Sequence, residues 1–279
     1  MDSTLNTSQA FAKRGLLSGV ALVAATVAAP SYATMFTLVD DNSSAVFYTD
    51  GGLQNNWIVD GTNHLYDQDF YYRLDDNSVA ESISTLGINV EGVTDTNFDG
   101  DDDTLFVEYS GTGFTIETRW TLDGAIAGSD LSDMAEQITI TNTGSTALTM
   151  SFFQYVDFDL GDFISDDYAR YTNANTVTQW DNQAVLAETV VTPAATNWEI
   201  GPFASILNSL NSVAGYDLSN GVPYFGPGDA TWAFQWDITL AANDAFQISK
   251  DKNIRVPEPS ILALMGIGLI GLGFARRRV

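Results

Sequence analysis

The sequence lacks cysteine entirely and contains a single histidine, His64. Without cysteine, a disulfide framework, a thiolate zinc site and a cysteine nucleophile are all excluded. His64 ends the turn-like run from Gly61, with no serine or cysteine motif beside it, so we expect a surface or turn residue. The sequence also has no Gly-x-Ser-x-Gly motif, phosphate-binding glycine loop or histidine-rich zinc motif. An enzyme of this composition would have to depend on its carboxylates.

Basic residues are scarce, and the 279-residue chain has a formal net charge of −25 at pH 7. All of the 36 acidic residues except Asp2 and Glu258 lie within residues 34–256, which hold only six of the 11 basic residues. A field of this sign repels nucleic acids and favours divalent cations, so we expect no nucleic-acid partner. Most of the carboxylates are expected to keep the surface solvated.

The first 33 residues have the three parts of a secretory signal peptide. Lys13 and Arg14 form a positive region, residues 15–29 are apolar, and Ser31-Tyr32-Ala33 places small residues where signal peptidase reads them. We predict a signal helix within residues 1–33 that signal peptidase cleaves after Ala33. A Lys-Arg pair is not a twin-arginine signal, which favours the general secretory route.

The last 24 residues contain three successive signals. Pro257, Glu258 and Pro259 form a segment that cannot be helical, and residues 261–275 follow without a single charge. A helix over these fifteen residues is only about 22 Å long, short of a bilayer core of ~30 Å. The terminal Arg276, Arg277 and Arg278 are expected to stay on the cytoplasmic side. The predicted transmembrane helix is therefore a weak permanent anchor, with the rest of the chain outside.

This order of Pro-Glu-Pro, short glycine-rich apolar helix and arginine cluster resembles the PEP-CTERM sorting tag of Gram-negative bacteria. The resemblance covers residues 256–279 only. It implies that the membrane protease exosortase recognises Pro257, Glu258 and Pro259, and that the protein takes part in a system that accompanies extracellular polysaccharide or biofilm production. It also implies anchoring on the outer side of the inner membrane before processing, and then a place at the cell surface or in the extracellular matrix.

Residues 34–255 remain as one extracytoplasmic domain and show the alternation of apolar residues that is typical of β-strands. Phe114, Ile116, Trp120 and Leu122 share one face of a predicted strand, and Trp120 is expected in the core. Similar runs bring the count to ten or more, whereas only residues 203–210 are predicted to be a helix. The turn residues Asn142 to Ser145 predict a hairpin between strands 137–141 and 149–158. The expected fold is all-β, a large antiparallel β-sandwich of the supersandwich kind.

Two acidic segments are candidate metal sites. The first places oxygen ligands at alternate positions around Gly100, as a calcium loop does, and comprises Asp95, Asn97, Asp99, Asp101 and Asp103. Position twelve of this loop is Phe106 where a calcium loop has glutamate, so a solvated acidic hairpin is the open alternative. The second segment surrounds Gly161 and comprises Asp157, Asp159, Asp162, Asp166 and Asp167. Calcium is the ion that the first segment would hold, and the second segment could hold another hard cation.

Three tryptophans are candidate sugar-stacking residues because their neighbours are polar or turn-like. They are Trp57, Trp180 and Trp198. Exposed aromatic rings beside carboxamides suit carbohydrate recognition, although tryptophan also covers the cores of sandwiches.

The tag, the acidity and the strand pattern together favour a non-catalytic exported protein that associates with extracellular polysaccharide. The alternative is a surface glycan-active enzyme that uses a carboxylate pair, a chemistry that needs no histidine. Residues 138–160 resemble sugar-active supersandwich domains and are the part of the sequence that points to this alternative.

Overall fold

The computed structural model describes residues 34–256 except residues 52 and 174. The predicted signal helix with Ala33, the sorting residues Pro257 to Pro259 and the apolar run 261–275 lie outside the described residues. Among the helices that are described, none combines the length and the apolar character needed to cross a bilayer.

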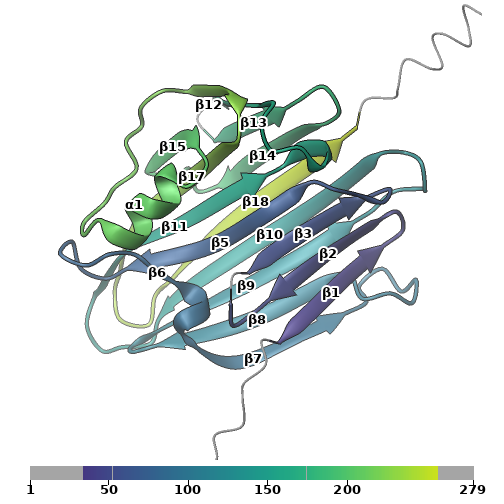
Figure 1. Ribbon diagram of the computed structural model, residues 1–279. Coiled ribbons are helices and arrows are strands. Elements are labelled where there is room, and N and C mark those ends of the chain that lie inside the picture. The colour runs from purple at the N-terminus through teal and green to yellow at the C-terminus, as the bar shows by residue number, and fades with distance from the viewer. Residues whose placement is uncertain (1–33, 52, 174, 257–279) are drawn as a thin grey trace, which may run out of the picture. The chain divides into compact units, whose positions relative to one another are not determined.

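Two nine-stranded sheets make up the described part of the chain (Figure 1). The first sheet, in spatial order, is β1 (Met35–Asp40), β2 (Ser43–Tyr48), β3 (Gln54–Val59), β5 (Leu65–Arg73), β11 (Leu148–Phe158), β17 (Ala230–Leu240) and β15 (Asn197–Pro202). Two short strands attach to it, β4 (Thr62–Asn63) on β3 and β6 (Glu81–Ser82) on β5.

The second sheet is, in spatial order, β16 (Tyr224–Gly228), β12 (Asp167–Asn173), β13 (Thr176–Trp180), β14 (Val185–Thr192), β18 (Ala245–Arg255), β10 (Leu131–Asn142), β9 (Phe114–Asp123), β8 (Thr104–Gly111) and β7 (Gly87–Thr94). The paired strands are antiparallel throughout both sheets. One α-helix, α1 (Ser205–Ser212), and two single 3-10 turns, η1 (Ile83–Thr85) and η2 (Leu160–Asp162), complete the described elements.

The two sheets pack face to face, which confirms the predicted antiparallel β-sandwich. Alternate residues of each strand point between the sheets, as in β9, where Phe114, Ile116, Trp120 and Leu122 are buried. Trp120, Trp232 and Trp236 all lie in this core, as expected from their places in the strands. The predicted helix also forms, two residues further along than residues 203–210.

The predicted hairpin between residues 137–141 and 149–158 is wrong. Strand β10 pairs with β9 and β18 in the second sheet, whereas β11 pairs with β5 and β17 in the first. The turn between them therefore crosses from one sheet to the other. Asn142 fixes this crossing, because its side-chain amide donates hydrogen bonds to the carbonyls of Thr146, Leu240 and Ala241 at 2.8, 3.1 and 3.0 Å.

The outer face of the first sheet carries a second, smaller apolar cluster beneath α1 (Figure 1). Phe153 and Tyr155 of β11 contribute to it, together with Ile206 and Leu210 of the helix. Because side chains alternate along a strand, the next residue of β11 on this face is Asp157. The apolar cluster therefore ends at a carboxylate.

Candidate functional site

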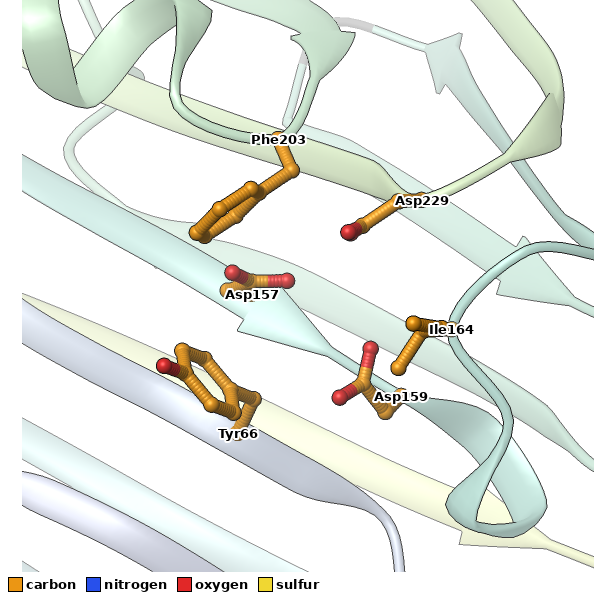
Figure 2. A pocket seen from close by; sticks show the side chains of 6 residues that line it. All are labelled: Tyr66, Asp157, Asp159, Ile164, Phe203 and Asp229. Carbon is orange, nitrogen blue, oxygen red and sulfur yellow. The ribbon is translucent and has the colours of Figure 1, made fainter.

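A pocket opens on the outer face of the first sheet, at the point where β11 ends (Figure 2). Its volume is about 200 Å³, and it combines three carboxylates with three large apolar side chains. The lining residues are Tyr66, Asp157, Asp159, Ile164, Phe203 and Asp229. An acidic floor with aromatic walls is a combination that suits a sugar rather than an apolar ligand.

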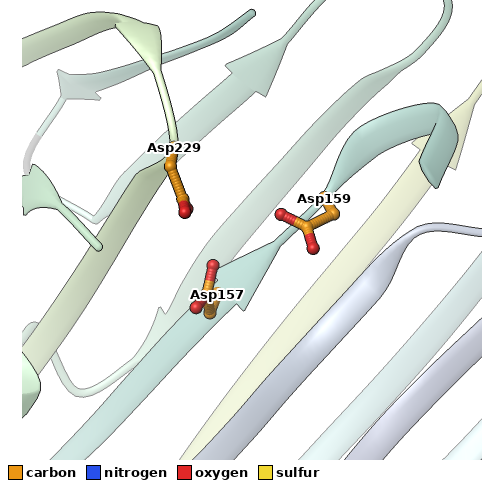
Figure 3. Close-up of side chains that lie close together, drawn as sticks. All are labelled: Asp157, Asp159 and Asp229. Carbon is orange, nitrogen blue, oxygen red and sulfur yellow. The ribbon is translucent and has the colours of Figure 1, made fainter. Parts of the chain in front are cut away.

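The three carboxylates come from two places that are far apart in the sequence. Asp157 lies on β11 opposite Asp67 of β5 and Thr231 of β17. Asp159 follows directly after β11, and Asp229 lies between β16 and β17. Each of the three offers an oxygen that lies within 4.8 Å of the others, and Figure 3 shows the side chains converging on one space. We call Asp157, Asp159 and Asp229 the acidic trio.

The turn that carries Asp159 is held by His64, which the sequence predicted to be a surface or turn residue. His64 is 1% exposed, and its Nδ1 accepts a hydrogen bond from the Gly161 backbone at 3.1 Å. Gly161 has φ of 67°, and a Cβ there would lie 2.8 Å from the side chain of Gln183, so the turn requires glycine. Burial lowers the pKa of His64 to about 4, although the charge of Asp162 opposes the change. His64 is therefore a neutral, buried anchor for the turn.

Asp157 is the most enclosed member of the trio, with only 1% of its surface exposed. Its Oδ2 accepts a weak hydrogen bond from the Tyr155 hydroxyl at 3.4 Å. Its Oδ1 and the Oδ1 of Asp229 are buried and have no hydrogen-bond partner among the described residues. Buried oxygens without a donor are costly to keep ionised, so the trio calls for a proton, a cation or a ligand hydroxyl.

The members of the trio differ in the pKa of their carboxyl groups. Burial, reinforced by the charges of Asp229, Asp159 and Asp67, raises the pKa of Asp157 from 3.8 to about 8. Burial and the charges of Asp229 and Asp162 raise the pKa of Asp159 to about 6. Burial also raises the pKa of Asp229. At pH 7 the site therefore holds a protonated Asp157 beside an ionised Asp159.

A wider, more polar pocket of about 520 Å³ adjoins the first and shares Tyr66 and Asp159 with it. Its other lining residues are Asn55, Asn56, Asn63, Leu65, Asp67 and Asp162. Burial raises the pKa of Asp67 to about 6. The first pocket thus combines the acidic trio with large apolar side chains, and the adjoining pocket is rich in carboxamides.

The trio is also a group of oxygen ligands that could hold a metal ion. Only its members Asp157 and Asp159 belong to the acidic segment around Gly161 that the sequence suggested. Asp229 was not foreseen, because it stands alone between two strands and no local spacing marks it.

The other acidic segment, residues 95–103, forms the connection between β7 and β8 and does not contribute to the trio. Its side chains bind the loop's own backbone. Asp95 accepts hydrogen bonds from the amides of Phe98 and Gly100, Asp99 from that of Asp101, and Asp103 from those of Thr96 and Asn97. The Asn97 amide donates to Asp40 at 2.8 Å. Calcium binding by this loop stays a prediction.

The three candidate sugar-stacking tryptophans lie apart from the pocket. Trp57 is completely buried and its indole donates to Ser132 Oγ at 3.0 Å, so the expectation that it stacks on a ligand is wrong. Trp180 and Trp198 are partly exposed, and each stacks on a tyrosine, with ring centroids 5.7 Å and 4.0 Å apart. All three tryptophans have polar neighbours in the sequence, and this pattern does not distinguish a buried indole from an exposed one.

Comparison with known proteins identifies the end of the chain and the fold. The PEP-CTERM protein-sorting motif matches residues 255–278, which confirms the resemblance of the tail and implies export, membrane anchoring and processing by exosortase. No curated protein matches the sequence.

Two solved structures share the sandwich. A bacterial glucoamylase complexed with acarbose is 7% identical with a TM-score of 0.56, over 82% of this chain and 34% of that one. A galactose mutarotase related enzyme from Lactobacillus acidophilus is 8% identical with a TM-score of 0.50, over 80% of this chain and 97% of that one. The chain thus spans about a third of the glucoamylase and nearly all of the mutarotase-related enzyme.

These comparisons contradict the expectation of a non-catalytic protein. At such low identity they show a shared fold, but the structures that share it are named for the processing of sugars. The expectation relied on the tag, the acidity and the strand pattern, and none of these reports a site made of carboxylates from separate strands.

Proposed function

We propose that the protein is a glycan-active enzyme that cleaves glycosidic bonds with the carboxylates of the acidic trio. The observation that carries the proposal is the convergence of three aspartates, with oxygens within 4.8 Å, in a pocket lined by Tyr66 and Phe203. The sugar-processing enzymes that share the fold support the same class of substrate.

The separated pKa values suggest the role of each carboxylate. Asp157, with a pKa of about 8, carries a proton at pH 7 and is the general acid that protonates the leaving oxygen. Asp159, with a pKa of about 6, is ionised and acts as the nucleophile that attacks the anomeric carbon. The charge of Asp229 contributes to the raised pKa of both. Oxygens of the trio that lie within 4.8 Å of one another favour a retaining pair, with carboxyl groups ~5–5.5 Å apart, over an inverting pair at ~6.5–9.5 Å.

The side chains that line the two pockets support a sugar as the substrate. Tyr66 is 57% exposed and Phe203 is 44% exposed, and their rings meet edge to face with centroids 6.1 Å apart. Such exposed rings can stack against the apolar face of a sugar ring. Asn55 and Asn56 line the adjoining pocket and offer donors and acceptors for hydroxyl groups.

The substrate that fits an exported, strongly acidic protein is an extracellular polysaccharide. The sorting motif supports a route through signal peptidase and exosortase, with the domain on the outer side of the inner membrane before processing and at the cell surface or in the matrix afterwards. The field of the domain disfavours anionic polymers, so we propose a neutral or weakly charged glycan.

The pH dependence of the reaction tests these roles. We expect kcat/KM to rise with pH as Asp159 ionises near 6, to peak near 7 and to fall as Asp157 loses its proton near 8. Both values belong to the trio as a coupled group. Initial rates of reducing-end formation between pH 4 and 10 measure the profile. A rate that keeps rising above pH 9 would exclude Asp157 as the acid.

Calcium is the second candidate occupant of the trio. Bound there, a divalent cation would keep Asp157 ionised, so we expect millimolar Ca²⁺ to lower activity at pH 7 while raising the melting temperature. At ~100 times its dissociation constant the ion adds about 2.7 kcal/mol to the stability of the folded protein.

Melting curves in chelator and in Ca²⁺ measure the shift in melting temperature for the wild type, Asp229→Asn and Asp99→Asn. The shift should disappear in Asp229→Asn and persist in Asp99→Asn, because the first is in the trio and the second in the loop at residues 95–103. Loss of the shift in Asp99→Asn alone would assign the ion to that loop, and an unchanged wild type would count against calcium altogether.

A further inference from the structure

The core between the sheets contains an ionic cluster that the proposed reaction does not use. Glu136 of β10, Glu188 of β14, and Lys250 and Lys252 of β18 are all fully buried and form ion pairs with one another. The first sheet contributes two buried carboxamides to the same cluster, Gln68 of β5 and Gln154 of β11. Buried charges are expensive, which makes a chemical role worth testing.

Lys252 and Gln68 approach each other across the two sheets. The Lys252 ammonium donates hydrogen bonds to Gln68 Oε1 and to Glu136 Oε1. The Gln68 amide nitrogen donates to the same Glu136 oxygen at 2.8 Å. Glu136 Oε1 therefore contacts both the Lys252 amine and Gln68 Nε2. Gln68 Nε2 is the leaving group if the Lys252 amine attacks the Gln68 carbonyl carbon.

Gln154 completes the arrangement around the Gln68 carbonyl. Its Nε2 lies 3.4 Å from Gln68 Oε1 and 2.7 Å from Glu188 Oε1. When Lys252 attacks, the Gln68 oxygen thus keeps Gln154 as the donor that faces the developing negative charge. None of these side chains is accessible to bulk water, so hydrolysis does not compete.

We propose that Lys252 and Gln68 form an intramolecular isopeptide bond, with Glu136 as the proton-transfer residue. Lys252 passes a proton to Glu136, and the freed Nζ attacks Gln68 Cδ. Glu136 returns this proton to Nε2, the Cδ–Nε2 bond breaks and ammonia leaves. The second Nζ proton passes to Glu136, so the products are a secondary amide, ammonia and a protonated Glu136. The reaction needs no oxidant, cofactor or second enzyme.

The bond would link the two sheets covalently in a protein that has no cysteine. It would close a loop between positions that are 184 residues apart in the sequence, the kind of long closure that most restricts an unfolded chain. Lys252 also lies on the last strand before the sorting motif. The cross-link would therefore join β18, the strand next to the sorting motif, to β5 of the first sheet.

Mass spectrometry of the purified, denatured protein after its processing tests the proposal. We expect an intact mass about 17 Da below that of the processed sequence, and a tryptic peptide in which the Gln68 and Lys252 segments are joined. Trypsin should fail to cleave after Lys252. In Gln68→Met and in Glu136→Gln the deficit should vanish, whereas the exposed-site control Gln247→Met should keep it.

The wild-type peptides decide the matter even if the buried variants fail to fold. Separate, unlinked Gln68 and Lys252 peptides at full mass would overturn the proposal. A peptide joining Lys252 to Glu136, with loss of water in place of ammonia, would also overturn it, because the acyl donor would then be the carboxylate. Either result is independent of whether the acidic trio is catalytic.

Discussion

Asp157→Asn is expected to lower the rate of glycan cleavage by ~10²–10⁴-fold, the usual contribution of a general acid. The amide has nearly the shape of the carboxylic acid but cannot give up a proton at pH 7. Because the side chain is buried and the trio is crowded with negative charge, replacement by a neutral group should leave the fold intact. Initial rates of reducing-end formation by the purified variant measure the loss.

Asp244→Asn is the matched control. It makes the same chemical change on an exposed residue of the turn between β17 and β18, away from the pocket, and should retain full activity. Comparable losses in both variants would mean that charge alone, and not position, matters.

Asp157→Asn should also stabilise the protein at alkaline pH. The pKa of Asp157 is higher in the folded protein than in the unfolded one, so its stabilising contribution is complete below pH 3.8 and is lost as pH rises through about 8. Asparagine does not ionise and avoids this loss. Thermal melts at pH 9 should show the variant above the wild type, with the difference shrinking toward pH 5.

Lys250→Met is expected to destabilise the protein by ~3–5 kcal/mol, the usual cost of removing one partner from a buried ion pair. It removes the ammonium that lies 3.4 Å from Glu188 and 4.8 Å from the centre of the Phe70 ring. The other lysine near Glu188, Lys252 at 3.9 Å, carries no charge once it is cross-linked to Gln68. Burial lowers the pKa of Lys250, and Glu136 opposes this change. The melting temperature should fall by roughly 6–20 °C for a domain of this size.

The double variant Lys250→Met with Glu188→Gln tests the physical reason. Glutamine keeps the size of Glu188 and removes the charge left without its partner, although its single oxygen can accept only one of the hydrogen bonds that Gln154 and Trp232 donate at 2.7 and 2.9 Å. More than half of the lost stability should return. A double variant as unstable as the sum of both changes would show that packing, and not charge balance, is lost.

The strands were predictable from the sequence because alternation is local. The predicted strand over residues 114–122 is β9 almost residue for residue, and the three core tryptophans lie where their strands place them. Which sheet a strand joins is not local. The Asn142 to Ser145 turn has the composition of a hairpin, yet Asn142 uses its side chain to bind carbonyls near the end of β17, a partner that no spacing reveals.

The candidate site was half predictable. Asp157 and Asp159 stand out as a dense acidic segment, but Asp229 becomes their neighbour only through the pairing of β11 with β17. Trp57 was misjudged because Asn55 and Asn56 are polar, although the indole itself points inward. The buried lysines were missed for the opposite reason. Charge normally marks the solvent face of a strand, but here Lys250 and Lys252 lie between Ile248 and Ile254 on the inner face.

The most direct test of the account is product analysis after the processed protein is incubated at pH 7 with a panel of neutral and acidic polysaccharides. The account predicts new reducing ends with at least one neutral glycan, and retention of the anomeric configuration in the first product. In Asp157→Asn the new reducing ends should be lost. Binding to a glycan without any new reducing end, or equal cleavage by wild type and Asp157→Asn, would contradict it.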